Sequence, residues 1–162
     1  MVRRFLAAFV TAVVLFTPAF AHEVCAQPAS GDVPGPEPVL ATGELMSLVM
    51  EPLYKELKLT LDKPPRDRKE WAAIYSAAVR LAEANNLLFF RSASRHTADP
   101  RWPGFIADGR TAAMDISEAA FVALQNVRAS NYAAIKAKLP AVSASCNACH
   151  RGLGTDARNV KP

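Results

Sequence analysis

Glycine, cysteine and histidine are scarce in this chain of 162 residues. It has 7 glycines, 3 cysteines and 3 histidines, and no stretch alternates apolar and polar residues as a half-buried strand would. The missing strand pattern favours an all-α fold. The few cysteines and histidines argue against a structural zinc site, which needs four ligands, because His22 and His96 lie far from the cysteine pair near the C-terminus.

Neither sign of charge dominates the chain. Lysine and arginine number 19 against 15 aspartates and glutamates, which gives a formal net charge of +4. Two of the basic residues, Arg3 and Arg4, belong to an N-terminal leader, and without them 17 minus 15 leaves +2. A charge this small does not indicate a nucleic-acid partner.

Residues 1–21 have the pattern of a secretory signal peptide. Arg3 and Arg4 form its basic start, residues 5–16 its apolar stretch, and small residues precede the expected cleavage point after Ala21. The apolar stretch is short for a membrane span. We therefore expect cleavage, export to the periplasm and no stable membrane span in the mature protein.

Two segments outside the expected domain are rich in turn-forming or polar residues. Residues 22–40 contain several prolines and glycines, which predicts an extended, flexible lead-in. Cleavage after residue 26 instead of residue 21 would remove Cys25, to which we assign no role. Residues 157–162 form a polar tail that we expect to be frayed.

Four amphipathic helices are expected between these segments, with Pro52 inside the first and Pro140 inside the last. Proline in a helix removes a hydrogen bond, so we expect a bend or a loosened turn at Pro52 and either a kink or a new helix start at Pro140. Thr42 is expected to cap the first helix, and Asp67 with Glu70 the second. The predicted ranges are 42–59, 67 to about 91–94, 105–129 and 131–152.

The motif Cys146-Asn147-Ala148-Cys149-His150 carries the most specific chemistry. In an exported chain, C-x-x-C-H is typical of covalent haem attachment, with two thioether bonds and an imidazole on the iron. A thioredoxin-like redox pair would need a βαβ setting, which the sequence lacks. Both cysteines also continue an apolar stripe with a 4-3-4-3-4 spacing, so they should lie on the core-facing side of a helix. The stripe comprises Ile135, Leu139, Val142, Cys146, Cys149 and Leu153.

A leader, four helices and C-x-x-C-H near the end of the last helix resemble the class II c-type cytochromes, the cytochrome c-prime and cytochrome c-556 family. The resemblance implies an antiparallel four-helix bundle over residues 41–156. It also implies one covalent haem c on Cys146 and Cys149, with His150 as the proximal iron ligand. The family commonly has an aromatic residue and an arginine a few positions after this histidine. Here Arg151 follows at once, so the usual tuning of the histidine is not implied.

The resemblance leaves the sixth ligand of the iron open. In relatives similar to cytochrome c-556, a methionine on the first helix completes the coordination, and Met46 lies at that position. Met50, one turn further, is the second candidate, and both can equally be core residues. With a methionine ligand the protein would carry single electrons. Without one it would resemble cytochrome c-prime and bind nitric oxide or carbon monoxide.

We expect an electron carrier rather than an enzyme, because no histidine is placed to assist peroxide chemistry. His96 is expected to be a surface residue. The expected partners are periplasmic redox proteins, and because relatives often pair through their first two helices, a homodimer is one expected assembly. A basic cluster around the first turn can steer an acidic partner or simply be solvated. It comprises Lys55, Lys58, Lys63, Arg66, Arg68 and Lys69.

Overall fold

The computed structural model describes residues 37–91, 96–127, 131–155, 157 and 159–162. The leader, Cys25 and the lead-in as far as residue 36 lie outside these residues, so the expectations for them remain predictions. All described residues belong to the unit Gly35–Pro162. Every regular element among them is helical, which confirms the all-α prediction for this part of the chain.

The first helical stretch changes its winding part of the way along. It consists of α1 (Thr42–Leu45), the π-helical η1 (Met46–Met50) and α2 (Glu51–Thr60). Pro52 has no N–H to offer the carbonyl of Leu48, and its ring would crowd that carbonyl in an α-helix. The turn before Pro52 is wider, with the N–H of Glu51 bonded to the carbonyl of Met46, five residues back. Pro52 therefore loosens a turn, as predicted.

The helix starts are capped in ways that differ from the prediction in detail. Thr42 is not the cap of α1. Ala41 occupies that position, and its N–H donates to the Glu44 carboxylate at 2.8 Å. The Asp67 carboxylate does cap the second helix, accepting from the N–H of Glu70 at 2.9 Å, as expected. Side-chain oxygens thus satisfy N–H groups that have no intrahelical partner.

The remaining helices follow the predicted order, with shifted ends. They are α3 (Arg68–Asn86), the 3₁₀-helical η2 (Leu87–Phe90), α4 (Trp102–Gln125), α5 (Tyr132–Lys136) and α6 (Leu139–Gly152). The third helix was expected from Phe105 but begins at Trp102, because Pro103 fits its first turn. Pro140 lies in the first turn of α6, so the last helical stretch is broken and begins anew there.

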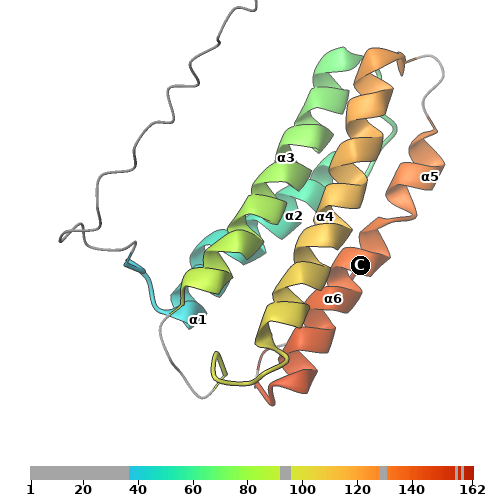
Figure 1. Cartoon of the computed structure of the whole chain (residues 1–162). Coiled ribbons are helices and arrows are strands. Elements are labelled where there is room, and N and C mark those ends of the chain that lie inside the picture. The colour runs from blue at the N-terminus through green and yellow to red at the C-terminus, as the bar shows by residue number, and fades with distance from the viewer. Residues whose placement is uncertain (1–36, 92–95, 128–130, 156, 158) are drawn as a thin grey trace, which may run out of the picture. The chain divides into compact units, whose positions relative to one another are not determined.

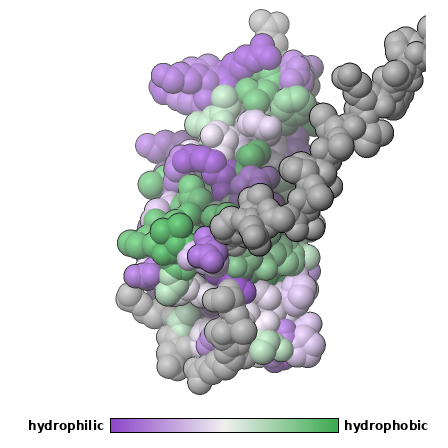
Figure 2. All heavy atoms as spheres, turned by 60° about the vertical axis from the view of Figure 1, so that its left-hand side comes forward, coloured by the Kyte–Doolittle hydropathy of each residue, from purple (hydrophilic) through white to green (hydrophobic). Residues whose placement is uncertain are grey.

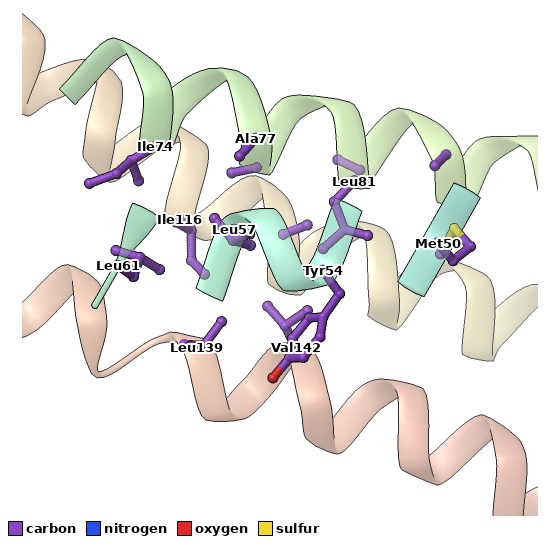
Figure 3. Packing of buried hydrophobic residues seen from close by; sticks show 14 of the residues in the cluster. Met50, Tyr54, Leu57, Leu61, Ile74, Ala77, Leu81, Ile116, Leu139 and Val142 are labelled. Carbon is purple, nitrogen blue, oxygen red and sulfur yellow. The ribbon is translucent and has the colours of Figure 1, made fainter. Parts of the chain in front are cut away.

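The helices pack side by side around one apolar core (Figure 1). The most extensive contact joins α3 to α4, α6 packs on α4, and α2 packs on α3. Figure 3 shows buried side chains from α2, α3, α4 and α6 meeting between the helices. The inward face predicted for the second helix is buried throughout: Trp71, Ile74, Ala78, Leu81, Asn85 and Leu88.

The α3–α4 contact contains one close approach that only glycine permits. A Cβ atom on the buried Gly109 would lie 2.6 Å from Oδ1 of Asn85. Asn85 is itself buried, and its amide nitrogen donates to the carbonyl of Leu81 at 2.8 Å. This pair fixes how closely α4 approaches α3.

Several large apolar side chains remain at the surface. Figure 2 shows hydrophobic patches lying among hydrophilic residues on the face it presents. Phe89 and Phe121 are 42% and 48% exposed. The full set is Val39, Leu48, Leu59, Leu87, Phe89, Phe90, Phe121 and Val122. None of the helices within the described ranges is long and apolar enough to cross a membrane.

Candidate functional site

Both cysteines of the motif and His150 lie on one face of α6. They are three and four residues apart, and they follow the buried Leu139 and Val142 at helical spacing. The motif side chains are half-buried and neither cysteine forms a disulfide. Cys146 and Cys149 thus continue the helical spacing of Leu139 and Val142, but they are only partly buried and do not belong to the core cluster.

The environment of the two thiols keeps them protonated. Burial, with a smaller contribution from Cys146, raises the pKa of Cys149 to about 11. Burial also raises the pKa of Cys146. Redox-active cysteines have a lowered pKa and often lie at a helix N-terminus, whereas Cys149 lies in the last turn of α6. The thioredoxin-like alternative is therefore disfavoured on chemistry as well as on fold.

The His150 imidazole is neutral and has an unused buried nitrogen. Burial lowers the pKa of His150, so the ring carries no proton charge at neutral pH and one nitrogen offers a lone pair. Its Nδ1 atom is buried, and no hydrogen-bond partner for it occurs among the residues that the structure covers. A buried polar atom without a partner is costly. The ring is thus suited to bind a further group.

The N-terminal turn of α4 supports one flank of the motif helix. A Cβ atom on Gly152 would clash with the ring of Phe105, so the two helices meet closely there. The guanidinium of Arg101 donates to the carbonyl of Gly152 at 2.6 Å. The end of α6 is therefore held against the start of α4.

The C-terminal tail supports the other flank. The side chain of Asn147, inside the motif, donates to the carbonyl of Val160 at 2.8 Å and accepts from its N–H at 2.7 Å. The Tyr54 hydroxyl donates to the carbonyl of Lys161 at 2.8 Å. The expectation of a frayed tail is wrong for residues 159–162, because polar groups on two helices bind its backbone.

The first helical stretch runs antiparallel to α6 and faces its motif side. Tyr54 lies beside Ser143 and Cys146. Burial raises the pKa of Tyr54, while a hydrogen bond with Ser143 lowers it and the nearby Cys146 raises it by smaller amounts. In Figure 3, Leu61 and Leu139 lie at one end of this pair of helices and Met50 at the other. The backbones of α2 and α6 approach each other much less closely than those of α4 and α6.

The two candidate methionine ligands are on this first stretch, both in η1. Met50 belongs to the core and is 8% exposed, whereas Met46 is half-buried and packs on the edge of the core. The antiparallel direction of the helices places η1 toward the end at which α6 terminates. Met46 thus lies on η1, whereas Cys146, Cys149 and His150 all lie on α6.

The donor atoms fit a flat attached group better than a bare metal ion. Within the described ranges, no group of three or more His, Cys, Asp or Glu side chains converges to hold a metal ion. Two thiols and an imidazole at C-x-x-C-H spacing on one helical face are the groups that covalent haem attachment uses. The residues present fit that group.

The basic cluster of the first turn is partly neutralised. Lys55 pairs with Glu51 at 2.6 Å, and Arg66 pairs with Glu70. Both pairs are exposed, which indicates a solvated surface rather than a built site.

Comparisons with protein-family models, with curated proteins and with solved structures found no match for this chain.

Proposed function

We propose that this chain is a periplasmic c-type cytochrome that carries one electron, related to the class II cytochromes. In this proposal residues 41–156 form an antiparallel four-helix bundle with one haem c near the end of its last helix. The observation that carries the proposal is the C-x-x-C-H motif, whose cysteines and histidine lie on a single, partly buried face of α6.

The proposed roles follow from the chemistry of each side chain. Cys146 and Cys149 would hold the haem by thioether bonds, each formed when a thiol adds its sulfur and its hydrogen across one vinyl group. His150 would bind the iron through its neutral ring. Bound haem iron alternates between the ferrous and ferric states and so carries a single electron. Asn147 and Gly152, tied to the tail and to α4, would keep the motif turn in place.

Met46 is the proposed sixth ligand. Met46 is only partly buried, whereas Met50 is buried in the core. A thioether ligand raises the reduction potential of haem iron, which suits an electron carrier. The leader at residues 1–21 supports export, and periplasmic redox proteins are the proposed partners.

Expression of the full chain in a host that matures c-type cytochromes tests the proposal. Mass spectrometry under denaturing conditions should show the mature polypeptide plus one haem. Cys146→Ala and Cys149→Ala should each retain haem through one thioether only, and the double variant should retain none covalently. Cys25→Ala is the matched control and should keep the full adduct.

Two results would contradict this function. One is a bare polypeptide mass for the wild-type chain, without colour, in a host that loads haem onto another cytochrome. The other is a haem adduct that persists in the double cysteine variant.

A further inference from the structure

The last turn of α6, which carries His150, ends in a Schellman motif. The N–H of Thr155 donates to the carbonyl of His150 at 3.0 Å, and the N–H of Gly154 donates to the carbonyl of Arg151 at 3.2 Å. Gly154 has φ of 62°, the left-handed conformation that this cap requires and that glycine adopts readily. The backbone of His150 is thus held from its C-terminal side by the chain that follows.

The carbonyl of Gly152 is bonded by a residue from another helix. Arg101, the N-cap residue of α4, donates to it from Nη2 at 2.6 Å. The same guanidinium donates from Nε to Oδ1 of Asp99 at 3.0 Å and from Nη2 to Oδ2 at 2.8 Å. The backbone N–H of Arg101 also donates to Asp99, at 2.8 Å. Such a two-pronged pair orients the guanidinium as well as attracting it.

Packing reinforces these hydrogen bonds. The guanidinium of Arg101 lies over the ring of Phe105, 5.8 Å from its centre. The same ring contacts the backbone of Gly152, where no Cβ atom would fit. One turn of α4 therefore restrains the last turn of α6 by a hydrogen bond and by a close packing contact.

We infer that Arg101 is a positioning residue for His150, and this inference rests on the proposed haem function. Gly152 is two residues beyond His150, about 3 Å along the helix axis. A shift or rotation of this turn would move the imidazole with it. By fixing Gly152, Arg101 would hold the turn that carries His150, and with it the imidazole, in one position.

Position, rather than charge, is the effect assigned to Arg101. Its hydrogen bonds hold the pKa of Asp99 at about 2, so the carboxylate stays ionised and the pair has no net charge. The Arg101 side chain is 58% exposed, so water screens the ion pair. The specific contribution of Arg101 is therefore the directed hydrogen bond that it donates to the carbonyl of Gly152.

Arg101→Leu and Asp99→Asn separate position from charge. Both changes break the Asp99–Arg101 pair that orients the bond to Gly152. They leave unpaired charges of opposite sign near His150, because Arg101→Leu leaves Asp99 unpaired and Asp99→Asn leaves Arg101 unpaired. The positioning role predicts a larger high-spin fraction of the haem-loaded protein in both variants. Arg101→Lys, which cannot form both prongs and the Gly152 bond together, should fall between wild type and Arg101→Leu. Arg110→Leu is the matched control, because Arg110 lies on α4 but donates to Asn86 of α3.

A second readout needs no haem. In full-length apoprotein, amide hydrogen exchange at Leu153, Gly154 and Thr155 should be about tenfold faster or more in Arg101→Leu, since a hydrogen bond to a charged donor is lost. Arg110→Leu should leave these three amides unchanged.

A failure of the positioning role of Arg101 can be distinguished from a failure of the proposed haem function. Haem-loaded wild type with exchange and spin state unaltered in Arg101→Leu would overturn the inference alone. Potentials that move in opposite directions in Arg101→Leu and Asp99→Asn, with no change of spin state, would show a charge effect and also overturn it. A bare wild-type mass would overturn the haem function, and the inference with it.

Discussion

At the scale of single residues, burial favours the uncharged form of each titratable group in the motif. The same apolar surroundings raise the pKa of both thiols and lower that of the imidazole, because burial disfavours every charged form. The thiols therefore stay protonated and the ring stays neutral at the same pH. A redox pair or a zinc-thiolate site would need the opposite shift in the cysteines.

The proposed sixth ligand of the haem iron is also a single residue. The sequence offers Met46 and Met50, and of these Met46 is the one that is not buried in the core. We expect Met46→Ala to convert the oxidised haem protein to a high-spin form and to remove the methionine–iron charge-transfer band, because the thioether would leave the iron. Its reduction potential should also fall. Absorption spectra and a redox titration of the purified variant measure both effects.

Two other methionines provide the controls for that experiment. Met50→Ala should lower stability, as truncation of a core side chain does, and leave the band in place. Met114→Ala, on α4, should do the same. A wild-type spectrum that is already high-spin, and that Met46→Ala leaves unchanged, would instead support the gas-binding alternative with an open distal face.

At the scale of helices, close contacts between a glycine backbone and a side chain of the neighbouring helix determine which surfaces meet. Gly109 lets α4 approach Asn85 of α3, and Gly152 lets α6 approach Phe105 of α4. Pro52 has a different effect, since it widens the turn of η1 and changes which side chains of the first stretch face inward. Each of these residues matters for what it lacks, a Cβ atom or an N–H.

Substitution of Gly109 tests whether the close approach of α4 to Asn85 of α3 requires glycine at this position. Gly109→Ala should lower the free energy of unfolding by about 1–3 kcal/mol, because its methyl group would displace the buried Asn85 amide. Urea denaturation followed by circular dichroism measures the change.

Gly104 is the matched glycine on the same helix, with nothing within 4 Å of a Cβ atom. Gly104→Ala should change stability by less than about 1 kcal/mol, toward a more stable protein. If Asn85 is the obstacle, adding Asn85→Ala to Gly109→Ala should cost less than the sum of the two single changes. Equal effects of the two glycine substitutions would contradict this account.

At the scale of the whole molecule, the apoprotein should respond to pH through its thiols. The folded-state pKa of Cys149 is about 11, above its ordinary 9.0, and that of Cys146 is also raised. Above pH 9 the unfolded chain loses thiol protons that the folded chain still holds. Stability supplied by the protonated thiols is therefore complete below pH 9 and is lost as the pH rises through 11.

This pH dependence is measured by thermal unfolding of apoprotein between pH 7 and pH 11. The melting temperature should fall over the alkaline part of this range in wild type, and fall less in Cys149→Ala. The haem-loaded protein should resemble the variant, because sulfur in a thioether bond has no proton to lose. Parallel curves for wild type and Cys149→Ala would show that other groups, such as Tyr54, cause the alkaline loss.

Patterns among neighbouring residues were sufficient to predict the helices and their buried faces. Apolar spacing of 3.6 residues places the helices, and the buried face from Trp71 to Leu88 follows from it, because each helix must turn its apolar side to the core. Pro140 in the first turn of α6 and Asp67 as the cap of α3 are also local effects. The C-x-x-C-H motif can be recognised in the sequence for the same reason, since it consists of five consecutive residues.

Contacts between distant segments were decided only by the tertiary structure. The bond from Arg101 to Gly152 joins residues 51 positions apart, and the tail meets Tyr54 across 107. No periodicity signals such pairs, because they depend on how the helices lie against one another. The tail looked frayed because it is short and polar, yet its backbone groups find partners on Asn147 and Tyr54 that only folding brings within reach.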